Sequence, residues 1–420
     1  MAELGWRYLS TEDKAGILDG IRDGRAYGGP YHVEIYPADR CNIDCFFCST
    51  AAIRGTDELP MERFTELLGE LREAGTRSIL LAGGGEPLFH RKIKPFLAAI
   101  RDARLPVEDL TTNGVLVTDE VAALLTEVCD DVTFSLNTAE AESYAQMMRT
   151  PARNFERVVE NIRKVVRMRG RGRRPKVRVQ FLVWRENYTQ IPRMYDLARD
   201  VGADAIVFNG LSHLRPDQTM SVDETGEMMR LYEAVVRRDE YRTIETIQSF
   251  EQDITPLVRE MNDRLTVERS RVHPALRAIR LLGRRDFTLR EKIAHHVLQR
   301  RRRRSTDPTL PTECLIGWYS LVIRSDGLVA PCCIFQATPM GNVFRESVDE
   351  IWNGERYQRF RSELRRIMDE REGWQHDPAA DTIVGPLCGA TGVGCPVRSF
   401  YFQADHEFRR GYARATGARG

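Results

Sequence analysis

Three closely spaced cysteines, Cys41, Cys45 and Cys48, are the residues whose type and spacing point most directly to chemistry. Thiolates are soft ligands that suit zinc ions and iron–sulfur clusters. Three of them together can bind three irons of a cubane and leave the fourth iron open, and an open position lets a metal site activate a substrate. The alternative is a structural zinc site, which needs a fourth ligand. His32 and His90 are the candidates for it, and we expect both to be ordinary surface or core histidines.

This cysteine triplet directly follows a strand-like run, in a region where strand and helix patterns alternate. Apolar runs predict six strands, at residues 32–36, 78–82, 108–111, 132–136, 177–183 and 205–208. Amphipathic patterns predict helices between them, at about 60–75, 91–103, 118–128, 153–168 and 188–201. Repeated βα units form a parallel sheet covered by helices, either as a partial barrel or as a doubly wound sheet. In both folds the functional residues lie at the C-terminal ends of the strands.

The spacing C-x3-C-x2-C after a first strand resembles the signature of the radical S-adenosylmethionine (SAM) superfamily. In that family the three cysteines hold a 4Fe–4S cluster, and the amino and carboxylate groups of SAM chelate the fourth iron. The resemblance implies that Phe47, the aromatic residue before the third cysteine, lies near the adenine. It also implies an α/β fold, a partial (β/α)6 TIM-like barrel, and covers roughly residues 32–210.

The second and third predicted strands end in segments that extend the resemblance. Gly84, Gly85 and Glu86 look like the family's GGE motif, which binds the amino group of SAM. Glycines suit this role because the backbone can approach a ligand closely. Asn113 lies in a Thr-Asn-Gly segment similar to one in many family members. The alternatives are a plain glycine-rich turn and a plain Asn-Gly turn.

Polar residues near the ends of the fourth and fifth strands complete the set. By resemblance, Ser135 and Asn137 would lie against the ribose or carboxylate of SAM. Gln180 alternates with apolar neighbours, so it could point into a barrel toward SAM, or equally toward solvent.

A second group of cysteines lies in the last quarter of the chain. Cys314 is followed after twelve residues by Gly327 and after four more by Cys332. An Asp-Gly turn between two apolar runs there predicts a β-hairpin. The segment resembles the C-terminal SPASM/twitch extension of radical SAM enzymes but has five cysteines instead of seven. We therefore expect one auxiliary 4Fe–4S cluster, with structural zinc as the alternative; its expected ligands are Cys314, Cys332, Cys388 and Cys395.

Two further cysteines have other expected roles. Cys333 is either a spare thiol or a replacement for one of the four auxiliary ligands. Cys129, late in a predicted helix, is expected to be a small buried apolar residue. The expected domains are an N-terminal helical lead-in (1–30), the partial barrel (31–214), a helical bridge (215–312) and the auxiliary cluster domain (313–420).

Composition limits the partners. The chain has 420 residues and a formal net charge of +1, so no overall field favours nucleic acid or a membrane. No apolar run is long enough for a signal peptide or a membrane span. A cytoplasmic protein with reduced thiols is expected. The arginine run at residues 300–304 is interpreted as a solvated face.

The resemblance implies a reaction class. A flavodoxin-like or ferredoxin-like donor would reduce the cluster, SAM would be cleaved to a 5′-deoxyadenosyl radical, and the radical would abstract a substrate hydrogen. The expected substrate is a small metabolite such as a sugar or aminocyclitol, which is dehydrogenated or epimerised. The alternative is maturation of a ribosomally made peptide, although the lead-in of about 30 residues is too short for a leader-binding domain. A non-catalytic iron–sulfur scaffold is the remote alternative.

Overall fold

A curved ten-stranded sheet organises the part of the chain that the computed structural model describes, residues 6–48, 50–51, 54–169, 174–211, 220–238, 245–249, 316–333 and 339–370. Its order is β10-β9-β8-β1-β2-β3-β4-β5-β6-β7. The strands are β1 (His32–Ile35), β2 (Ser78–Leu81), β3 (Val107–Thr112), β4 (Cys129–Ser135), β5 (Lys176–Val183), β6 (Ala205–Gly210), β7 (Glu245–Ser249), β8 (Ser320–Ile323), β9 (Leu328–Ala330) and β10 (Gly341–Asn342).

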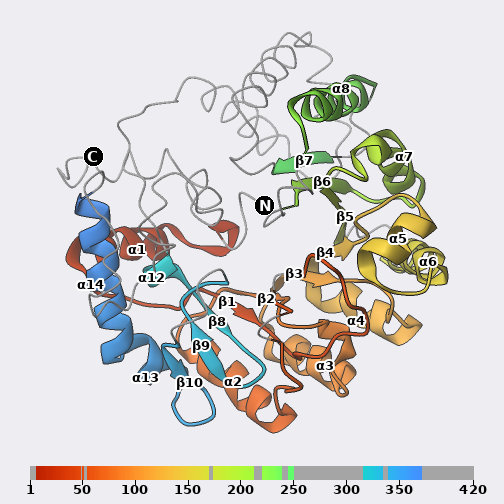
Figure 1. The fold of residues 1–420 in the computed structure, drawn as a ribbon. Coiled ribbons are helices and arrows are strands. Elements are labelled where there is room, and N and C mark those ends of the chain that lie inside the picture. Colours follow the sequence, from red (N-terminus) through yellow and green to blue (C-terminus); the bar gives the residue numbers. More distant parts are fainter. Residues whose placement is uncertain are drawn as a thin grey trace, which may run out of the picture.

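Strands β1 to β7 are parallel, β8 is parallel to β1 on its other side, and β9 and β10 are antiparallel. Helices cover the outer side of the curve (Figure 1). They are α2 (Met61–Glu73), α3 (Ile93–Ala103), α4 (Asp119–Val128), α5 (Ala141–Met148), α6 (Arg153–Met168), α7 (Ile191–Asp200) and α8 (Val222–Arg238). Alternating parallel strands and helices on an open curved sheet make the predicted partial barrel.

The remaining helices gather near the β8–β9 hairpin (Figure 1). They are α1 (Thr11–Asp23), α12 (Ile316–Tyr319), α13 (Val348–Asn353) and α14 (Glu355–Glu370), and a short 3-10 turn, η1 (Trp6–Tyr8), precedes them in the chain. Ser10 caps the N-terminus of helix α1. Its side chain accepts from the backbone N–H of Asp13, and the Asp13 carboxylate accepts from the backbone N–H of Ser10. This reciprocal cap satisfies two donors at the helix start. No helix among the described residues is long and apolar enough to cross a membrane.

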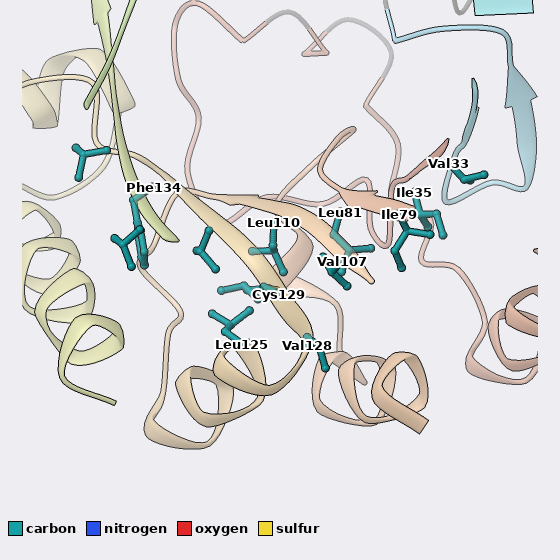
Figure 2. Close-up of a cluster of buried hydrophobic side chains, with 14 of the residues drawn as sticks. Val33, Ile35, Ile79, Leu81, Val107, Leu110, Leu125, Val128, Cys129 and Phe134 are labelled. Carbon is teal, nitrogen blue, oxygen red and sulfur yellow. The ribbon is translucent and has the colours of Figure 1, made fainter. Parts of the chain in front are cut away.

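The outward face of the strands carries the main core. Figure 2 shows Leu110, Phe134 and their neighbours on the strands directed toward Leu125 and Val128 of α4. All four are less than one-tenth exposed, and each fully buried apolar side chain stabilises the fold by about 1.5–3 kcal/mol. Cys129 is 2% exposed, as predicted for a small apolar residue. It ends α4 and begins β4, so it is not within the helix.

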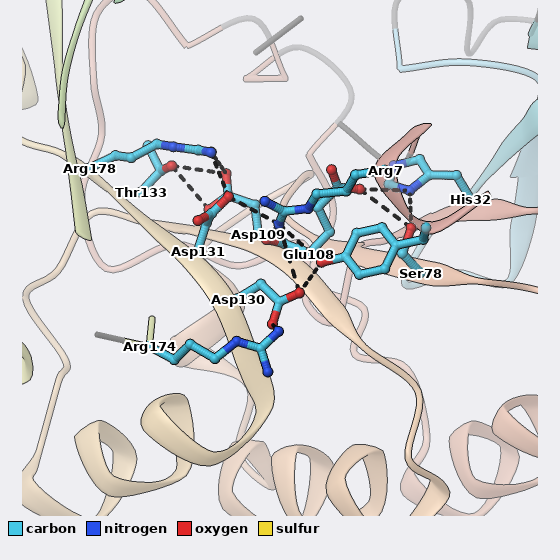
Figure 3. Close-up of polar contacts among 11 residues, drawn as sticks. Arg7, His32, Ser78, Glu108, Asp109, Asp130, Asp131, Thr133, Arg174 and Arg178 are labelled. Carbon is cyan, nitrogen blue, oxygen red and sulfur yellow. Dashed lines mark hydrogen bonds and ion pairs between the residues drawn. The ribbon is translucent and has the colours of Figure 1, made fainter. Parts of the chain in front are cut away.

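The opposite face of the same strands is polar near their N-terminal ends, because side chains alternate between the two faces of a strand. Asp109 accepts a hydrogen bond from Thr133 at 2.9 Å, and Asp131 is paired with Arg178. Arg7 of η1 reaches Asp131 at 3.3 Å. Figure 3 shows this network spanning β3, β4, β5 and the N-terminal turn. The N-terminal segment is therefore bound at the N-terminal ends of these strands, whereas the cysteine triplet follows the C-terminal end of β1.

Two elements differ from the predictions. The segment predicted as a helical bridge contains α8 but also the strand β7, which pairs with β6; the rest of that segment lies outside the described residues. Helix α5 was not predicted at all. The hairpin at β8 and β9 was predicted, and Gly327 in its turn has φ +80°, where glycine is favoured.

Candidate metal centre

The loop that carries the cysteine triplet leaves the C-terminal end of β1 and is held by the end of α5. The backbone N–H of Asp44 donates to the Met148 carbonyl at 3.3 Å, and that of Phe46 donates to the Met147 carbonyl at 3.2 Å. The last carbonyls of a helix have no partner within the helix. The cluster loop supplies those partners, so the position of the triplet depends on α5.

The three thiols are free and partly buried, and each has a polar or sulfur neighbour. Cys45 Sγ lies 3.7 Å from Met148 Sδ, and Cys41 Sγ lies 3.8 Å from Asn113 Nδ2. Burial raises the pKa of Cys41, and burial together with the neighbouring thiols raises that of Cys45 to about 12. Without metal these two thiols hold their protons, which iron displaces on binding.

The glycines after β2 are required by the cluster loop itself. Gly83 has φ +110°, and a Cβ there would lie 1.7 Å from the Tyr36 ring. A Cβ on Gly85 would lie 2.2 Å from the backbone oxygen of Arg40. The N–H of Gly85 donates to the Ala38 carbonyl at 3.0 Å. The loop after β2 therefore packs directly on the start of the cluster loop, and Gly84 lies between these two contacts.

Glu86 joins the ends of β2 and β3. It is 3% exposed, and burial raises its pKa to about 6 despite its hydrogen bonds. Its carboxylate accepts from the Thr112 hydroxyl at 2.6 Å, the Leu88 N–H at 3.1 Å and the Asn113 N–H at 2.7 Å. A carboxylate has about four lone-pair sites, so one acceptor position is left for a ligand. The side chain of Asn113 points back to the cluster loop and donates to Asn42 at 2.8 Å.

The residues predicted at the ends of β4 and β5 lie together. Ser135 and Gln180 are paired in register, and the Ser135 hydroxyl donates to Gln180 Oε1 at 3.3 Å. The N–H of Asn137 donates to the Gln180 carbonyl at 2.9 Å. Asn137 has φ +62°, and its buried Oδ1 has no hydrogen-bond partner among the described residues. Phe47 contacts Phe46 edge to face, with ring centroids 5.4 Å apart.

A buried hydroxyl that sequence reasoning missed tests whether a cluster fits here. Tyr144 of α5 is fully buried, and its hydroxyl has no hydrogen-bond partner among the described residues. Burial raises its pKa, and Cys45, Glu86 and Cys41 are near enough to raise it further. A buried donor without a partner costs about 1–3 kcal/mol. Free thiols, together with an unused buried O–H donor on the helix that holds their loop, fit a group that brings sulfur acceptors.

The same donor set does not favour a single zinc ion. In the residues that the structure describes, no three His, Cys, Asp or Glu side chains converge as the ligands of one metal ion do. The thiolates of a cubane each bind a different iron, so they need not converge on one point. His32 is bound to Ser78 at 2.9 Å and His90 to the Leu59 carbonyl at 3.0 Å. Both histidines thus have other partners.

The second group of cysteines is described only in part, because Cys314, Cys388 and Cys395 lie outside the described residues. Cys332 and Cys333 follow β9, and neither forms a disulfide with another cysteine of the described residues. Burial raises the pKa of Glu34 to about 7, although hydrogen bonds with Tyr36 and Cys333 oppose the rise. The auxiliary ligand set stays a prediction.

Family models identify two regions of the chain. The model of the radical SAM superfamily matches residues 35–198, and that of the SPASM iron–sulfur cluster-binding domain matches residues 314–374. The chain is a radical SAM protein with a C-terminal SPASM domain. The first domain implies a 4Fe–4S cluster and SAM, and the second implies auxiliary iron–sulfur clusters. The SPASM match ends before Cys388 and Cys395.

Among similar proteins, a probable GTP 3′,8-cyclase of Methanococcus maripaludis is 30% identical over 169 residues, 39% of this chain and 53% of the cyclase. The chain thus spans about half the length of that relative. A tungsten-containing aldehyde ferredoxin oxidoreductase cofactor-modifying protein of Pyrococcus furiosus is 25% identical over 346 residues, 77% of this chain and 80% of that protein.

Solved structures share the fold. SuiB of Streptococcus suis, bound to its precursor peptide SuiA, has a TM-score of 0.55 at 17% identity, covering 84% of this chain and 71% of SuiB. The structure of anSMEcpe with bound AdoMet has a TM-score of 0.52 at 14% identity, covering 92% of this chain and 98% of that chain. These likenesses agree with the partial barrel described above.

Proposed function

We propose that this protein is a radical SAM enzyme whose catalytic 4Fe–4S cluster is held by Cys41, Cys45 and Cys48. The observation that carries the proposal is the meeting of these three free thiols with Glu86 and Asn113 at the ends of neighbouring parallel strands. Together with SAM, such a cluster supplies reductive cleavage of SAM to methionine and a 5′-deoxyadenosyl radical, which abstracts a hydrogen from the substrate.

The chain's own residues bind and orient SAM in this proposal. The free acceptor position of Glu86 and the side-chain-free backbone at Gly84 and Gly85 receive the amino group. Ser135, Asn137 and Gln180 form a polar group at the next strand ends, suited to the ribose or carboxylate. Asn137 Oδ1 has no donor among the described residues and favours the ribose, because a buried acceptor needs a donor and the ribose hydroxyls supply one. Phe47 presents an apolar ring for the adenine.

For the substrate we propose a small metabolite that is dehydrogenated or epimerised. The curated relatives are named for GTP and for a cofactor, which are not peptides. An auxiliary cluster held by Cys314, Cys332, Cys388 and Cys395 would accept the electron of a substrate radical and so give net oxidation. A flavodoxin-like or ferredoxin-like protein would donate the initial electron.

A second candidate substrate is a ribosomally made peptide. SuiB and anSMEcpe share the fold and were solved with bound peptides. Labelled substrates distinguish the two candidates, because deuterium at the attacked carbon is transferred into 5′-deoxyadenosine. Transfer from a labelled peptide and from none of the labelled metabolites would establish the second candidate.

Replacement of one triplet cysteine tests the catalytic assignment. The wild-type protein, reconstituted anaerobically, is expected to bind about eight irons, four per cubane, and to form 5′-deoxyadenosine from SAM with a strong reductant. Cys41→Ala is expected to abolish 5′-deoxyadenosine formation because an open cluster needs all three thiolates. Cys129→Ala is the matched control, since Cys129 is buried at the start of β4, and it should retain the activity. SAM cleavage by Cys41→Ala at the wild-type rate would refute the assignment.

The auxiliary cluster has a separate test. A variant with alanine at all three triplet positions should still bind about four irons, because the second cysteine group is intact. If this variant binds no iron, the auxiliary site is contradicted, and the assignment of the first cluster to Cys41, Cys45 and Cys48 is not affected.

A further inference from the structure

Helix α5 brings a tyrosine to the triplet that no motif of the sequence marks. The end of α5 accepts hydrogen bonds from the cluster loop at Met147 and Met148, and Tyr144 lies one turn earlier. The Tyr144 ring is fully buried and meets the Phe155 ring edge to face at 5.8 Å. Met148, four residues after Tyr144 and therefore on the same face of α5, has its Sδ 3.7 Å from Cys45 Sγ, and the Tyr144 hydroxyl interacts electrostatically with Cys45, Glu86 and Cys41. A packed ring thus holds the phenol on the face of α5 that reaches Cys45.

None of the described groups around the triplet accepts a hydrogen bond from the Tyr144 hydroxyl. Glu86 accepts from Thr112, Asn113 and Leu88, and the Tyr144 hydroxyl has no partner among the described residues. Thr50 lies 3.3 Å from Cys48 Sγ, but its hydroxyl donates to the Gly84 carbonyl at 2.8 Å. A hydroxyl has a single proton to donate. The thioether of Met148 has none.

We propose that the Tyr144 hydroxyl donates a hydrogen bond to a sulfur atom of the cluster held by Cys41, Cys45 and Cys48 and so raises the reduction potential of that cluster. Buried tyrosine hydroxyls usually find a partner, and the cluster brings sulfur acceptors to this place. A reduced cluster carries more negative charge, so an O–H donor stabilises it more than the oxidised form. Hydrogen bonds to the sulfurs are among the features that set such potentials. The inference rests on the proposed function, because it needs a cluster at the triplet.

Tyr144→Phe removes the donor and keeps the ring. The matched control is Tyr357→Phe in α14. Tyr357 is also fully buried, its hydroxyl has no hydrogen-bond partner in the described part of the chain, and it interacts with Cys332 instead of the triplet. Each reconstituted protein is titrated electrochemically without SAM and followed by electron paramagnetic resonance. The variant with alanine at all three triplet positions supplies the auxiliary signal to be subtracted. At a fixed potential, Tyr144→Phe is expected to lower the ratio of reduced to oxidised triplet cluster about fivefold, and Tyr357→Phe to leave it unchanged.

Donor strength gives a second variant, which keeps the ring and its hydroxyl. Incorporation of 3-fluorotyrosine at position 144 makes a more acidic hydroxyl and is expected to shift the ratio in the opposite direction. If both changes at position 144 leave the midpoint unchanged in protein of normal iron content, the hydrogen bond is refuted and the proposed function stands. If the wild-type triplet binds no iron, the proposed function fails first. If Tyr144→Phe does not fold, the fluorotyrosine protein alone decides the result.

Discussion

Gly85 shows how closely two backbones meet beside the cysteine triplet. A Cβ at this position would lie 2.2 Å from the Arg40 carbonyl oxygen and 2.4 Å from that of Asp39. Both atoms belong to the backbone, so neither can rotate away. Gly85→Ala is expected to displace the cluster loop, to destabilise the protein by about 1–3 kcal/mol and to lower the iron bound at the triplet. Urea unfolding and iron analysis measure the two effects.

A glycine elsewhere in the chain serves as the control. Gly69 is exposed on α2, and a Cβ there would have no atom within 4 Å. Gly69→Ala is expected to stabilise the protein by about 0.5–1 kcal/mol, because alanine loses less backbone freedom in a helix. Equal behaviour of the two variants would show that the contact at Gly85 is not restrictive.

At the scale of elements, the β8–β9 hairpin is joined to the cluster loop. The Ser325 hydroxyl in the hairpin turn donates to the buried carboxylate of Asp39, two residues before Cys41. Ser325→Ala leaves that carboxylate oxygen without this donor, which costs about 1–3 kcal/mol. We expect a lower unfolding midpoint in urea and faster loss of iron from the triplet on exposure to a chelator.

The control for the hairpin is an exposed serine of α14. Ser362 donates only to the Gln358 carbonyl in its own helix, at 2.9 Å. Ser362→Ala is expected to change stability by less than about 0.5 kcal/mol. An effect of Ser325→Ala no larger than this would mean that the hairpin and the cluster loop are not coupled.

The elements also show where sequence patterns suffice. Most of the strands β1 to β6 and the hairpin were predicted from apolar runs between turn residues, whereas the predicted strand at 108–111 has Leu110 as its one apolar residue. Helix α5 was missed because eight residues are too few to form a stable helix alone. The packing of Tyr144 and the hydrogen bonds between the end of the helix and the cluster loop supply the remaining stabilisation. Strand β7 was missed because it has Ile247 as its one apolar residue and lies in the segment predicted as a helical bridge; it pairs with β6.

The features of the site also divide into those that the sequence predicts and those that it does not. The order of the triplet, Glu86, Asn113 and Ser135 on successive strands was predictable, because parallel strands bring their C-terminal ends to one edge. The packing of Gly85 on the backbone of Arg40 was not, since it depends on how two loops meet in space. Nor was the hydroxyl of Tyr144, because a missing partner is visible only once all neighbours are in place.

At the scale of the whole molecule, the polar network in Figure 3 binds the N-terminal turn to β3 and β4, and Arg178 extends the network to β5. Asp109 lies in this network, 6% exposed, and burial raises its pKa to about 6 despite Arg178 and the Thr133 hydroxyl. The unfolded chain has the ordinary value near 3.8. Between these two values the folded protein holds a proton that the unfolded chain has lost. The contribution of the Asp109 carboxyl to the free energy of unfolding is therefore fully present below about pH 4 and is lost as the pH rises toward 6.

Asp109→Asn removes this dependence, because asparagine stays neutral and still accepts from Thr133. The difference between about 6 and 3.8 corresponds to about 3 kcal/mol at most. Relative to wild type, the variant is expected to gain up to that amount between pH 4 and pH 7 in urea unfolding of the metal-free protein. Asp102→Asn, at an exposed carboxylate paired with Arg101, is the control and should follow the wild-type curve because surface ion pairs contribute little. Parallel curves for wild type and Asp109→Asn would show that Asp109 titrates normally, and that the network at the N-terminal ends of the strands is as hydrated as the surface.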